Sequence, residues 1–358
     1  MTDEHSAGSR ALGVSVAICC HNGQRRLPST LSCLKNQRAP GVAWEVLIID
    51  NASTDHGVEI AHQSWLACGP APMRIVREPR LGLCCARQTA LREARHEIVS
   101  FVDDDNHVAP DWVAIASEVM SADPELGAIG SINCAAAEIA FPYWFRSYCQ
   151  YYAAADHYRS STMPDFMLNG AGMTLRREAW RDMERHGFHS QLSDRVGRRL
   201  SSCGDIEWGL ALVLAGWKFR LEPRLRLEHF LSAERLKWPY LRRLLRAVGE
   251  SNVVLDGYYY AGQRGTAVKD RLRQHWWWHF VAEVVQLVRI HPPRQLARAY
   301  FTEMEGDDDA TDIELRLGRL LGLVTLRSRY AAIRRDISLA PWRRREIVFG
   351  AANTNSGY

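Results

Sequence analysis

The first two-thirds of the chain alternates short apolar runs with segments of helical spacing, and this alternation restricts the possible folds more than any other feature. Strand-like runs lie at Val14–Cys20, Glu45–Ile49, Met73–Arg77 and Glu97–Val102. Helical spacing of apolar residues follows at Arg25–Gln37 and Leu83–Arg95. Alternating strands and helices form a parallel sheet covered by helices, which binds ligands at the carboxyl ends of its strands. The pattern predicts an α/β fold with its site at that edge.

Acidic residues follow two of these expected strands directly. Asp50 precedes the turn-rich stretch Asn51–Asp55, and Asp103, Asp104 and Asp105 follow the fourth strand. Because side chains alternate along an extended chain, Asp103 and Asp105 should point one way and Asp104 the other. Two carboxylates on one side are suitable ligands for Mg²⁺ or Mn²⁺. The alternative for this segment alone is a solvated acidic turn.

Beyond Phe230 the pattern is helical. We expect helices at Glu234–Gly249, Thr266–Ile290 and Asp312–Asp336, the second stopped by Pro292-Pro293. We therefore expect a flexible N-terminal tail over residues 1–12, an α/β domain over 13–230 and a helical C-terminal extension over 231–358.

The composition indicates a globular protein with reduced cysteines and a basic C-terminal third. Hydrophobic content of 47% and charged content of 24% are typical of a globular chain. Lys and Arg outnumber Asp and Glu between Leu231 and Arg345, which favours an anionic partner surface such as a phosphate or a lipid headgroup. The nine cysteines show neither zinc-binding spacing nor a disulfide framework, so we expect reduced thiols in a cytoplasmic protein. Met1–Arg10 lacks a hydrophobic signal region, and no apolar run is long enough to span a membrane.

Several segments, taken in order, resemble the motifs of family 2 glycosyltransferases. They are Val16–Asn22, Glu45–Asp55 (EVLIIDNASTD), Leu81–Arg87, Phe101–Asn106, Gly170–Met173, Gly204–Glu207, Gly216–Lys218 and His229. Each segment alone is a weak signal, but the ordered set, which covers residues 13–230, is specific. The resemblance implies a GT-A fold, with a mostly parallel sheet flanked by helices. It also implies that Mn²⁺ or Mg²⁺ bridges the protein and the diphosphate of a nucleotide sugar.

The resemblance assigns nucleotide-binding roles to Asn22, Asp50, Asn51, Arg87 and Asp103. Asp50 would accept a hydrogen bond from the imino group of a pyrimidine, which favours a UDP- or dTDP-sugar as the donor. The residues themselves leave an alternative, in which Asp50 caps its own turn through Ser53 or Asp55. Arg87 would face a phosphate, or it lies on a solvated helix face.

The resemblance also implies a metal site formed by Asp103, Asp105 and His229, the last just past an expected strand at Arg224–Glu228. His107 competes for the metal because it lies beside the acidic cluster. A lone histidine at a strand end is more often structural.

Asp205 is the expected general base, and Glu207 is the second candidate. Gly170, Gly172 and Trp208 are expected on the acceptor side. A structural alternative is that Asp205 only begins a helix, since Ser202–Asp205 has capping-box spacing, with Gly216 ending that helix. The chain departs from the family at Ala211, where an Arg is frequent, and at Gly204, where an acid is common.

The expected activity is metal-dependent, inverting transfer of a sugar to a glycan or lipid-linked acceptor, in the hexosyltransferase class. A nucleotidyltransferase and a non-catalytic subunit that binds sugar nucleotides or glycans are the alternatives. No nucleic-acid-binding module is recognised, so no nucleic-acid partner is expected.

The cluster Trp276-Trp277-Trp278 lies in a basic segment of the extension. Tryptophans beside cations favour a membrane–water interface, which would make the protein peripheral on the inner face of the membrane. The other interpretation is an extension helix packed on the main domain. The sequence does not specify the donor sugar, whose selection we expect to involve loops within Ala135–Leu168.

Overall fold

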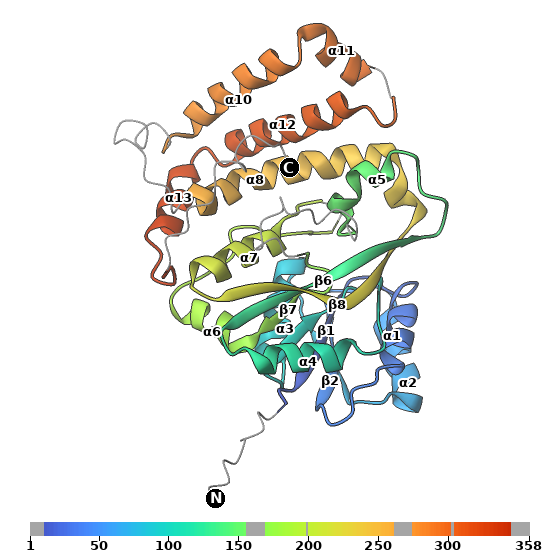
Figure 1. Cartoon of the computed structure of the whole chain (residues 1–358). Helices are drawn as coiled ribbons and strands as arrows, with labels where there is room; N and C mark the ends of the chain where they lie inside the picture. Colours follow the sequence, from blue (N-terminus) through green and yellow to red (C-terminus); the bar gives the residue numbers. More distant parts are fainter. Residues whose placement is uncertain (1–10, 155–168, 198–199, 261–273, 302–303, 345–358) are drawn as a thin grey trace, which may run out of the picture.

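The computed structural model describes residues 11–154, 169–197, 200–260, 274–301 and 304–344. Within them one eight-stranded curled sheet carries helices on both faces, and further helices form a layer beside it (Figure 1). The strands are β1 (Val14–Cys20), β2 (Trp44–Asp50), β3 (Met73–Arg77), β4 (Ile98–Phe101), β5 (Asn106–Val108), β6 (Leu126–Ala137), β7 (Thr174–Arg176) and β8 (Lys218–Leu231). The helices among them are α1 (Leu27–Lys35), α2 (Gly57–Cys68), α3 (Leu83–Glu93), α4 (Trp112–Ala122), α5 (Phe145–Tyr148), η1 (Cys149–Tyr152), α6 (Arg177–Arg185) and α7 (Gly204–Leu214).

The sheet order is β3-β2-β1-β4-β7-β6-β8-β5. Strand β1 pairs in parallel with β2 and β4, and β2 pairs in parallel with β3, so the four strands expected from the sequence are confirmed. Their carboxyl ends, including Cys20, Asp50 and Phe101, meet at one edge of the sheet. Helix α2 was not expected, although Val58, Ala61 and Trp65 are its buried residues and follow a helical spacing.

The other half of the sheet is mixed. Strand β7 runs antiparallel to both β4 and β6, whereas the long strands β6 and β8 are parallel to each other. Their pairing extends to Ala137 opposite Leu231. The expected strand end at Glu228 was therefore wrong, and His229 lies inside β8 because β6 continues to pair with it.

Apolar layers cover both faces of the parallel strands. On one face α1, α2 and α4 pack against the sheet, and on the other face α3, α6 and α7 do so. Side chains of β1 alternate between these layers, with Val16 and Ile18 on the first and Ala17 on the second. Burial on both faces explains why β1, β2 and β4 have nearly continuous apolar sequences, whereas the edge strand β3 has none of its residues fully buried.

The C-terminal layer is helical. It comprises η2 (Ala233–Leu236), α8 (Trp238–Tyr260), α10 (Trp276–Ile290), α11 (Pro293–Phe301), α12 (Asp308–Thr325) and α13 (Tyr330–Ser338). The first helix runs eleven residues beyond the expected end at Gly249. The single helix expected at Asp312–Asp336 is two helices, and the first starts early because Asp307 caps the backbone N–H groups of Asp309 and Ala310. The expected start at Thr266 lies outside the described residues.

The extension shares a core with the α/β part. One continuous apolar cluster joins Trp208 of α7 with Val248 and Tyr258 of α8 and with Trp342 after α13. The sheet ends at Leu231 and the described residues after it are helical. No helix in the described ranges is both long and apolar enough to cross a bilayer. Most of the expected tail, residues 1–10, lies outside the described residues.

Candidate active site

The three consecutive aspartates form the turn between β4 and β5. Asp104 lies under α1, where Arg26 donates from Nε to Oδ1 at 2.9 Å and from Nη2 to Oδ2 at 2.8 Å. The Thr30 hydroxyl donates to the Asp104 carbonyl at 2.9 Å. Asp103 and Asp105 instead lie within electrostatic range of Arg195. The turn thus divides its carboxylates between two sides, as the alternation indicated.

Asp105 is surrounded by nitrogen atoms. Its Oδ1 lies 3.4 Å from His229 Nε2 and accepts from Asn106 Nδ2 at 3.1 Å, and its Oδ2 accepts from Arg235 Nη1 at 3.1 Å. Burial by itself raises the pKa of the Asp105 carboxyl, but His229, Arg235 and Arg195 together hold that pKa below its ordinary value. Asp105 is therefore a carboxylate at neutral pH.

The orientation of His229 presents one nitrogen to Asp105. Its Nδ1 lies 2.7 Å from the Tyr152 carbonyl, so Nδ1 carries a proton that it donates there, and Nε2 is the nitrogen that faces Asp105. In the β5–β8 pairing, Asn106 is opposite His229 and His107 is opposite Glu228. Because neighbouring residues of a strand point to opposite faces, His107 projects away from His229. Its ring packs on Phe230 with centroids 5.9 Å apart.

Two donors, rather than the expected three, face each other where a metal was predicted. Among the described residues, no three His, Cys, Asp or Glu side chains form a metal-binding group, so Asp103 does not complete a site with Asp105 and His229. Arg235 Nη1 lies between the two donors, 3.1 Å from Asp105 Oδ2 and 3.2 Å from His229 Nε2. A carboxylate and an imidazole that already share a cation fit a divalent ion whose other positions are filled by phosphate oxygens and water.

A second group of carboxylates surrounds the guanidinium of Arg87 on α3. It is buried, its Nη1 donates to Asp194 Oδ2 at 2.9 Å, and Asp103 and Asp205 also lie within electrostatic range of it. Burial raises the pKa of Asp194 to about 6, although Arg87 opposes this rise. The alternative of a solvated helix face is wrong for Arg87. Its buried Nε has no hydrogen-bond partner in the described part of the chain.

Asp205 lies in the first turn of α7, partly exposed. Its Oδ2 accepts from Gly170 N at 2.5 Å and its Oδ1 accepts from Ile206 N at 2.9 Å. The N-cap residue is Cys203, in the left-handed region with φ 70°, and no side chain caps the helix. Ser202 is therefore not the N-cap that the capping-box spacing implied, but Asp205 does lie at the start of the helix, as that alternative expected. The expected helix end is confirmed, since Gly216 follows α7 with φ 96°.

The loop at residues 170–172 brings these groups together. A Cβ on Gly170 would lie 2.2 Å from Arg87 Nη2, so only glycine lets the loop lie directly on that guanidinium. Gly172 has φ +82°, and a Cβ there would lie 2.1 Å from Ser131 Oγ. The loop thereby holds the Gly170 N–H against Asp205 and beside Arg87.

Two other predicted site residues are buried in the core. Glu207 has no exposed surface, and its Oε1 accepts from Gln191 N and from the Tyr258 hydroxyl, each at 2.7 Å. Its Oε2 accepts from Leu192 N at 3.1 Å. Trp208 is 2% exposed and packs against Trp180, with ring centroids 4.2 Å apart and the ring planes tilted by 41°. Their burial argues against a catalytic role for Glu207 and an acceptor contact for Trp208, because neither can reach a bound acceptor.

The residues predicted to bind the nucleotide organise the loops beyond β1 and β2. Asp50 Oδ1 accepts from Ser53 N at 3.0 Å, so Asp50 caps its own turn as the alternative interpretation expected. Its Oδ2 has no hydrogen-bond partner among the described residues. Asn22 Oδ1 accepts from Thr54 N at 2.8 Å. The buried Asn51 donates to the Arg80 carbonyl and accepts from Gly82 N, each at 2.8 Å. Asn22 and Asn51 therefore hold the loops beside Asp50 in place.

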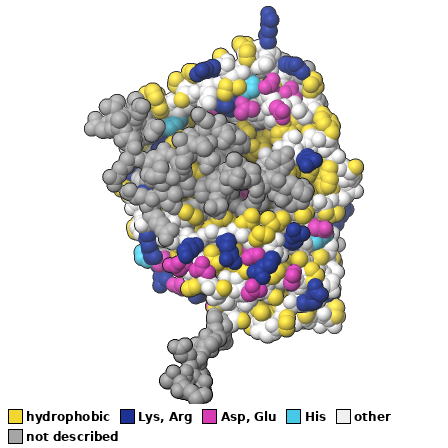
Figure 2. All heavy atoms as spheres, viewed as in Figure 1, with side chains coloured by type: hydrophobic (Ala, Val, Ile, Leu, Met, Phe, Trp, Pro, Cys, Tyr) yellow, Lys and Arg dark blue, Asp and Glu magenta, His cyan; other side chains and the backbone are white. Residues whose placement is uncertain are grey.

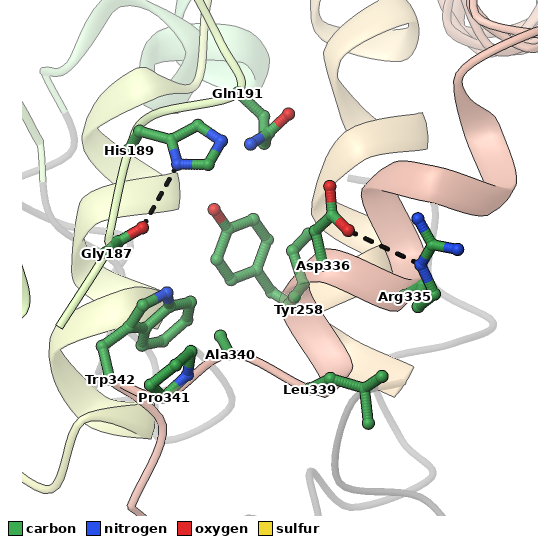
Figure 3. Close-up of a pocket in the computed structure, with 11 residues that line it drawn as sticks. Gly187, His189, Gln191, Tyr258, Arg335, Asp336, Leu339, Ala340, Pro341 and Trp342 are labelled. Atoms are coloured by element: carbon green, nitrogen blue, oxygen red, sulfur yellow. Dashed lines mark hydrogen bonds and ion pairs between the residues drawn. The ribbon is translucent and has the colours of Figure 1, made fainter.

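A separate pocket of ≈ 290 Å³ lies between the segment after α6 and helix α13 (Figure 3). His189, Gln191, Tyr258 and Trp342 are among its lining residues. Tyr258 links this pocket to α7, because its hydroxyl is the group that donates to Glu207. None of the predicted site residues lines the pocket.

Sequence reasoning missed the partners of the acidic residues. Arg26 is 78 positions from Asp104, Asp194 is 107 positions from Arg87, and Arg235 is 130 positions from Asp105. No local pattern marks such pairs. The excess of Lys and Arg after Leu231 indicated an anionic partner for the extension, but it did not identify Arg235 or its pairing with Asp105.

Comparisons with known proteins agree with this geometry. Residues 15–182 match the family model described as Glycosyl transferase family 2. The chain is 30% identical over 120 residues to chondroitin synthase of Escherichia coli, a stretch covering 33% of this chain and 17% of that protein. It is 36% identical over 100 residues to the uncharacterized glycosyltransferase YfnE of Bacillus subtilis, covering 28% of this chain and 25% of that protein. The matches therefore span a quarter or less of the length of these two relatives.

A solved structure extends the likeness in fold to most of the chain. It is the mannosyltransferase PcManGT of Pyrobaculum calidifontis in complex with GDP-Man and Mn²⁺. The TM-score is 0.53 at 18% sequence identity, and the match covers 91% of this chain and 85% of that one. The mixed, mostly parallel sheet with its flanking helices is thus the architecture of a known glycosyltransferase.

Proposed function

Because this chain belongs to glycosyl transferase family 2 and has the GT-A fold, we propose that it moves one sugar from a nucleotide-sugar donor to a hydroxyl of a glycan or lipid-linked acceptor, with inversion. The observation that carries the proposal is the convergence of Asp103, Asp194 and Asp205 around the buried Arg87. These acidic groups come from separate elements, and the Asp105–His229 pair lies at the same turn as Asp103.

Asp205 is the proposed general base. It takes the proton of the acceptor hydroxyl as that oxygen attacks the anomeric carbon and the nucleoside diphosphate departs. The Gly170 N–H and the Ile206 N–H hold its carboxylate in one orientation. Arg87 keeps this group of carboxylates together because it neutralises their mutual repulsion.

Asp105 and His229 are the proposed metal ligands. A divalent ion held there would neutralise charge on the donor diphosphate. The Tyr152 carbonyl fixes the His229 ring, and Asn106 fixes Asp105, so both donor atoms are oriented before an ion arrives.

Asp50 is the proposed contact to the base of the donor. Its Oδ2 is able to accept from the imino N–H of a pyrimidine while Oδ1 holds Ser53 N. This supports a UDP- or dTDP-sugar. The solved relative was crystallised with GDP-Man, so the donor test must include guanine nucleotides as well.

The test measures nucleoside diphosphate release from a panel of UDP-, dTDP- and GDP-sugars by the full chain with Mn²⁺, with and without EDTA. We expect release from one uridine or thymidine donor, its loss with EDTA and its return with added Mn²⁺. Asp205→Asn should reduce release at least about 100-fold, as removal of a general base does. Asp105→Asn should also lose the extra thermal stabilisation that the donor gives in the presence of Mn²⁺.

The matched control is Asp111→Asn, an exposed aspartate that precedes α4 and makes no capping bond. It should retain wild-type release. Full activity in Asp205→Asn would show that Asp205 is not the general base. If nucleotide sugars stabilise the wild type thermally but none is turned over, a non-catalytic subunit is favoured.

A further inference from the structure

Helix α10 lies on the protein surface with its apolar side chains facing outward, the opposite of the usual arrangement. Its outward side chains are apolar: Trp277, Trp278, Val281, Val285 and Val288 are 45%, 42%, 52%, 61% and 50% exposed. From Trp278 they follow one another at intervals of three or four residues, so they form one stripe along the helix. Figure 1 shows α10 and α11 as the outermost layer, beyond α12 and far from the N-terminus.

The inward side of α10 carries an acidic residue that pairs with arginines of α12. Glu283 is buried and accepts from Arg316 Nη1 at 3.0 Å and from Arg319 Nε at 3.2 Å, both on α12. Leu287 is buried beside it, and Trp276 and Phe280 pack inward on the cluster around Leu323. A surface helix ordinarily buries its apolar stripe and exposes its charges. Here ion pairs hold the helix to the protein, and the apolar stripe faces outward.

Within α10 and α11 the exposed charges have one sign, whereas the exposed acids Glu305, Asp308 and Asp309 follow α11. Between residues 274 and 299 the exposed charged side chains are Arg289, Arg294 and Arg298, and the one acidic residue of this segment is the buried Glu283. In Figure 2 hydrophobic and Lys or Arg side chains occur along the upper edge of the molecule, where Figure 1 places α10 and α11, and Asp or Glu side chains lie just below them. Apolar and cationic groups on one face complement a surface that is both apolar and anionic.

We propose that the outward face of α10 docks on an anionic membrane surface, with the helix lying in the plane of the interface. Two exposed tryptophans at one end of the stripe are suited to the headgroup region. The arginines of α11 are attracted to anionic lipids. Such a contact is monotopic, because the helix lies along the surface and does not cross it. A second copy of the chain is the competing occupant of this face, and the oligomeric state distinguishes the two.

Co-sedimentation of the full chain with vesicles tests this docking. One set of vesicles is phosphatidylcholine and the other is phosphatidylcholine with phosphatidylglycerol. We expect binding to the anionic set, weakened by salt, with a blue shift of tryptophan emission. Val281→Asp/Val285→Asp should weaken binding at least about tenfold, because it places charge where the apolar stripe meets lipid. Arg289→Gln/Arg294→Gln should remove the preference for anionic lipid.

The matched control is Leu66→Asp on α2, a 70% exposed apolar residue elsewhere on the surface, which should bind as wild type. Circular dichroism checks that all variants remain folded. The docking is disproved if the wild type stays in solution with both vesicles or if Leu66→Asp weakens binding equally. It is also disproved if the chain is a dimer that the Val281→Asp/Val285→Asp change dissociates. No donor or acceptor is present, so the outcome does not depend on the glycosyl-transfer proposal.

Discussion

At the residue scale, arginines from distant elements neutralise the acidic side chains of the site. Arg26 pairs with Asp104, Arg235 with Asp105, and Arg87 with Asp194. The first pair fixes the turn after β4, and the other two lie where charged substrate groups are proposed to bind. The two buried pairs, Arg235–Asp105 and Arg87–Asp194, contribute little net stability, because the charges lose their hydration on burial. Their main effect is to hold each carboxylate in one position.

Arg235→Gln should strengthen the binding of Mn²⁺. The guanidinium lies 3.1 Å from Asp105 Oδ2 and 3.2 Å from His229 Nε2, so an ion that approaches these donors meets a like charge. Without that charge we expect about tenfold tighter binding of Mn²⁺, measured by titration in the absence of nucleotide. Lys237→Gln removes a neighbouring exposed cation and should leave the affinity unchanged. Unchanged or weaker binding in Arg235→Gln would count against a metal at Asp105 and His229.

Glu207 should make stability depend on pH. Burial raises the pKa of its carboxyl to about 7 from an ordinary value near 4.5, although Tyr258 and two backbone N–H groups oppose the rise. Between these pH values the folded state holds the extra proton, so raising the pH through this window lowers the free energy of unfolding. The loss amounts to at most about 3 kcal/mol.

The measurement is urea unfolding at several pH values from 4.5 to 8, for the wild type and Glu207→Gln. The unfolding free energy of the wild type minus that of Glu207→Gln should fall as the pH rises, because only the wild type has a carboxyl proton to release at this position. A difference that stays constant over this range would show that Glu207 is ionised throughout.

At the element scale, α8 and α12 pack with their backbones almost in contact. A Cβ on Gly249 of α8 would lie 2.0 Å from the Leu315 carbonyl oxygen, and one on Gly318 of α12 would lie 2.0 Å from the Arg246 carbonyl oxygen. Gly322 continues this face one turn later. Glycines four residues apart thus let these two helices approach closely. The pair forms the base on which α10 is held by its ion pairs.

Gly318→Ala should therefore destabilise the protein, although alanine favours a helix more than glycine does by about 1 kcal/mol. The added methyl group has to displace backbone, and overpacking of this kind costs about 1–3 kcal/mol or more. Thermal unfolding provides the measurement. Leu321→Ala on the same helix changes a 48% exposed side chain and should have little effect. Equal stability of Gly318→Ala and the wild type would mean that the helices separate easily.

At the scale of the whole molecule, the helical extension and the α/β part share one apolar cluster. Trp342, which follows the last described helix, is 5% exposed and packs edge-on against Phe188 with centroids 5.3 Å apart. Tyr258 of α8 reaches Glu207 of α7. The extension therefore supports the helix that carries Asp205, and the two parts should not behave as independent domains.

We predict a single calorimetric unfolding transition for the full chain. Because the cluster crosses residue 231, loss of packing in one part exposes apolar surface of the other. Trp342→Ala should shift the whole transition to lower temperature, by about 3–5 kcal/mol in stability, and keep it single. Two separable transitions would support the boundary near residue 231 as a true domain boundary.

The order of strands and helices in the parallel half of the sheet was predictable from sequence. Strands β1, β2 and β4 are marked by apolar runs that are buried on both faces, and this is a local signal. The same pattern located the acidic turn at the sheet edge, and the alternation of side chains separated Asp104 from its neighbours. Helix α2, the length of β8 and the division of α12 from α13 were missed, because each depends on pairing or capping partners.

The sequence by itself determined which residue types stand at the carboxyl ends of the strands, because burial and periodicity act over a few residues. Only the tertiary structure decided their partners. It brought Asp194 to Arg87 and Arg235 to Asp105, it moved Glu207 and Trp208 into the core, and it turned the apolar stripe of α10 outward. These outcomes depend on contacts between residues distant along the chain, which are set by how the helices pack on the sheet and on each other.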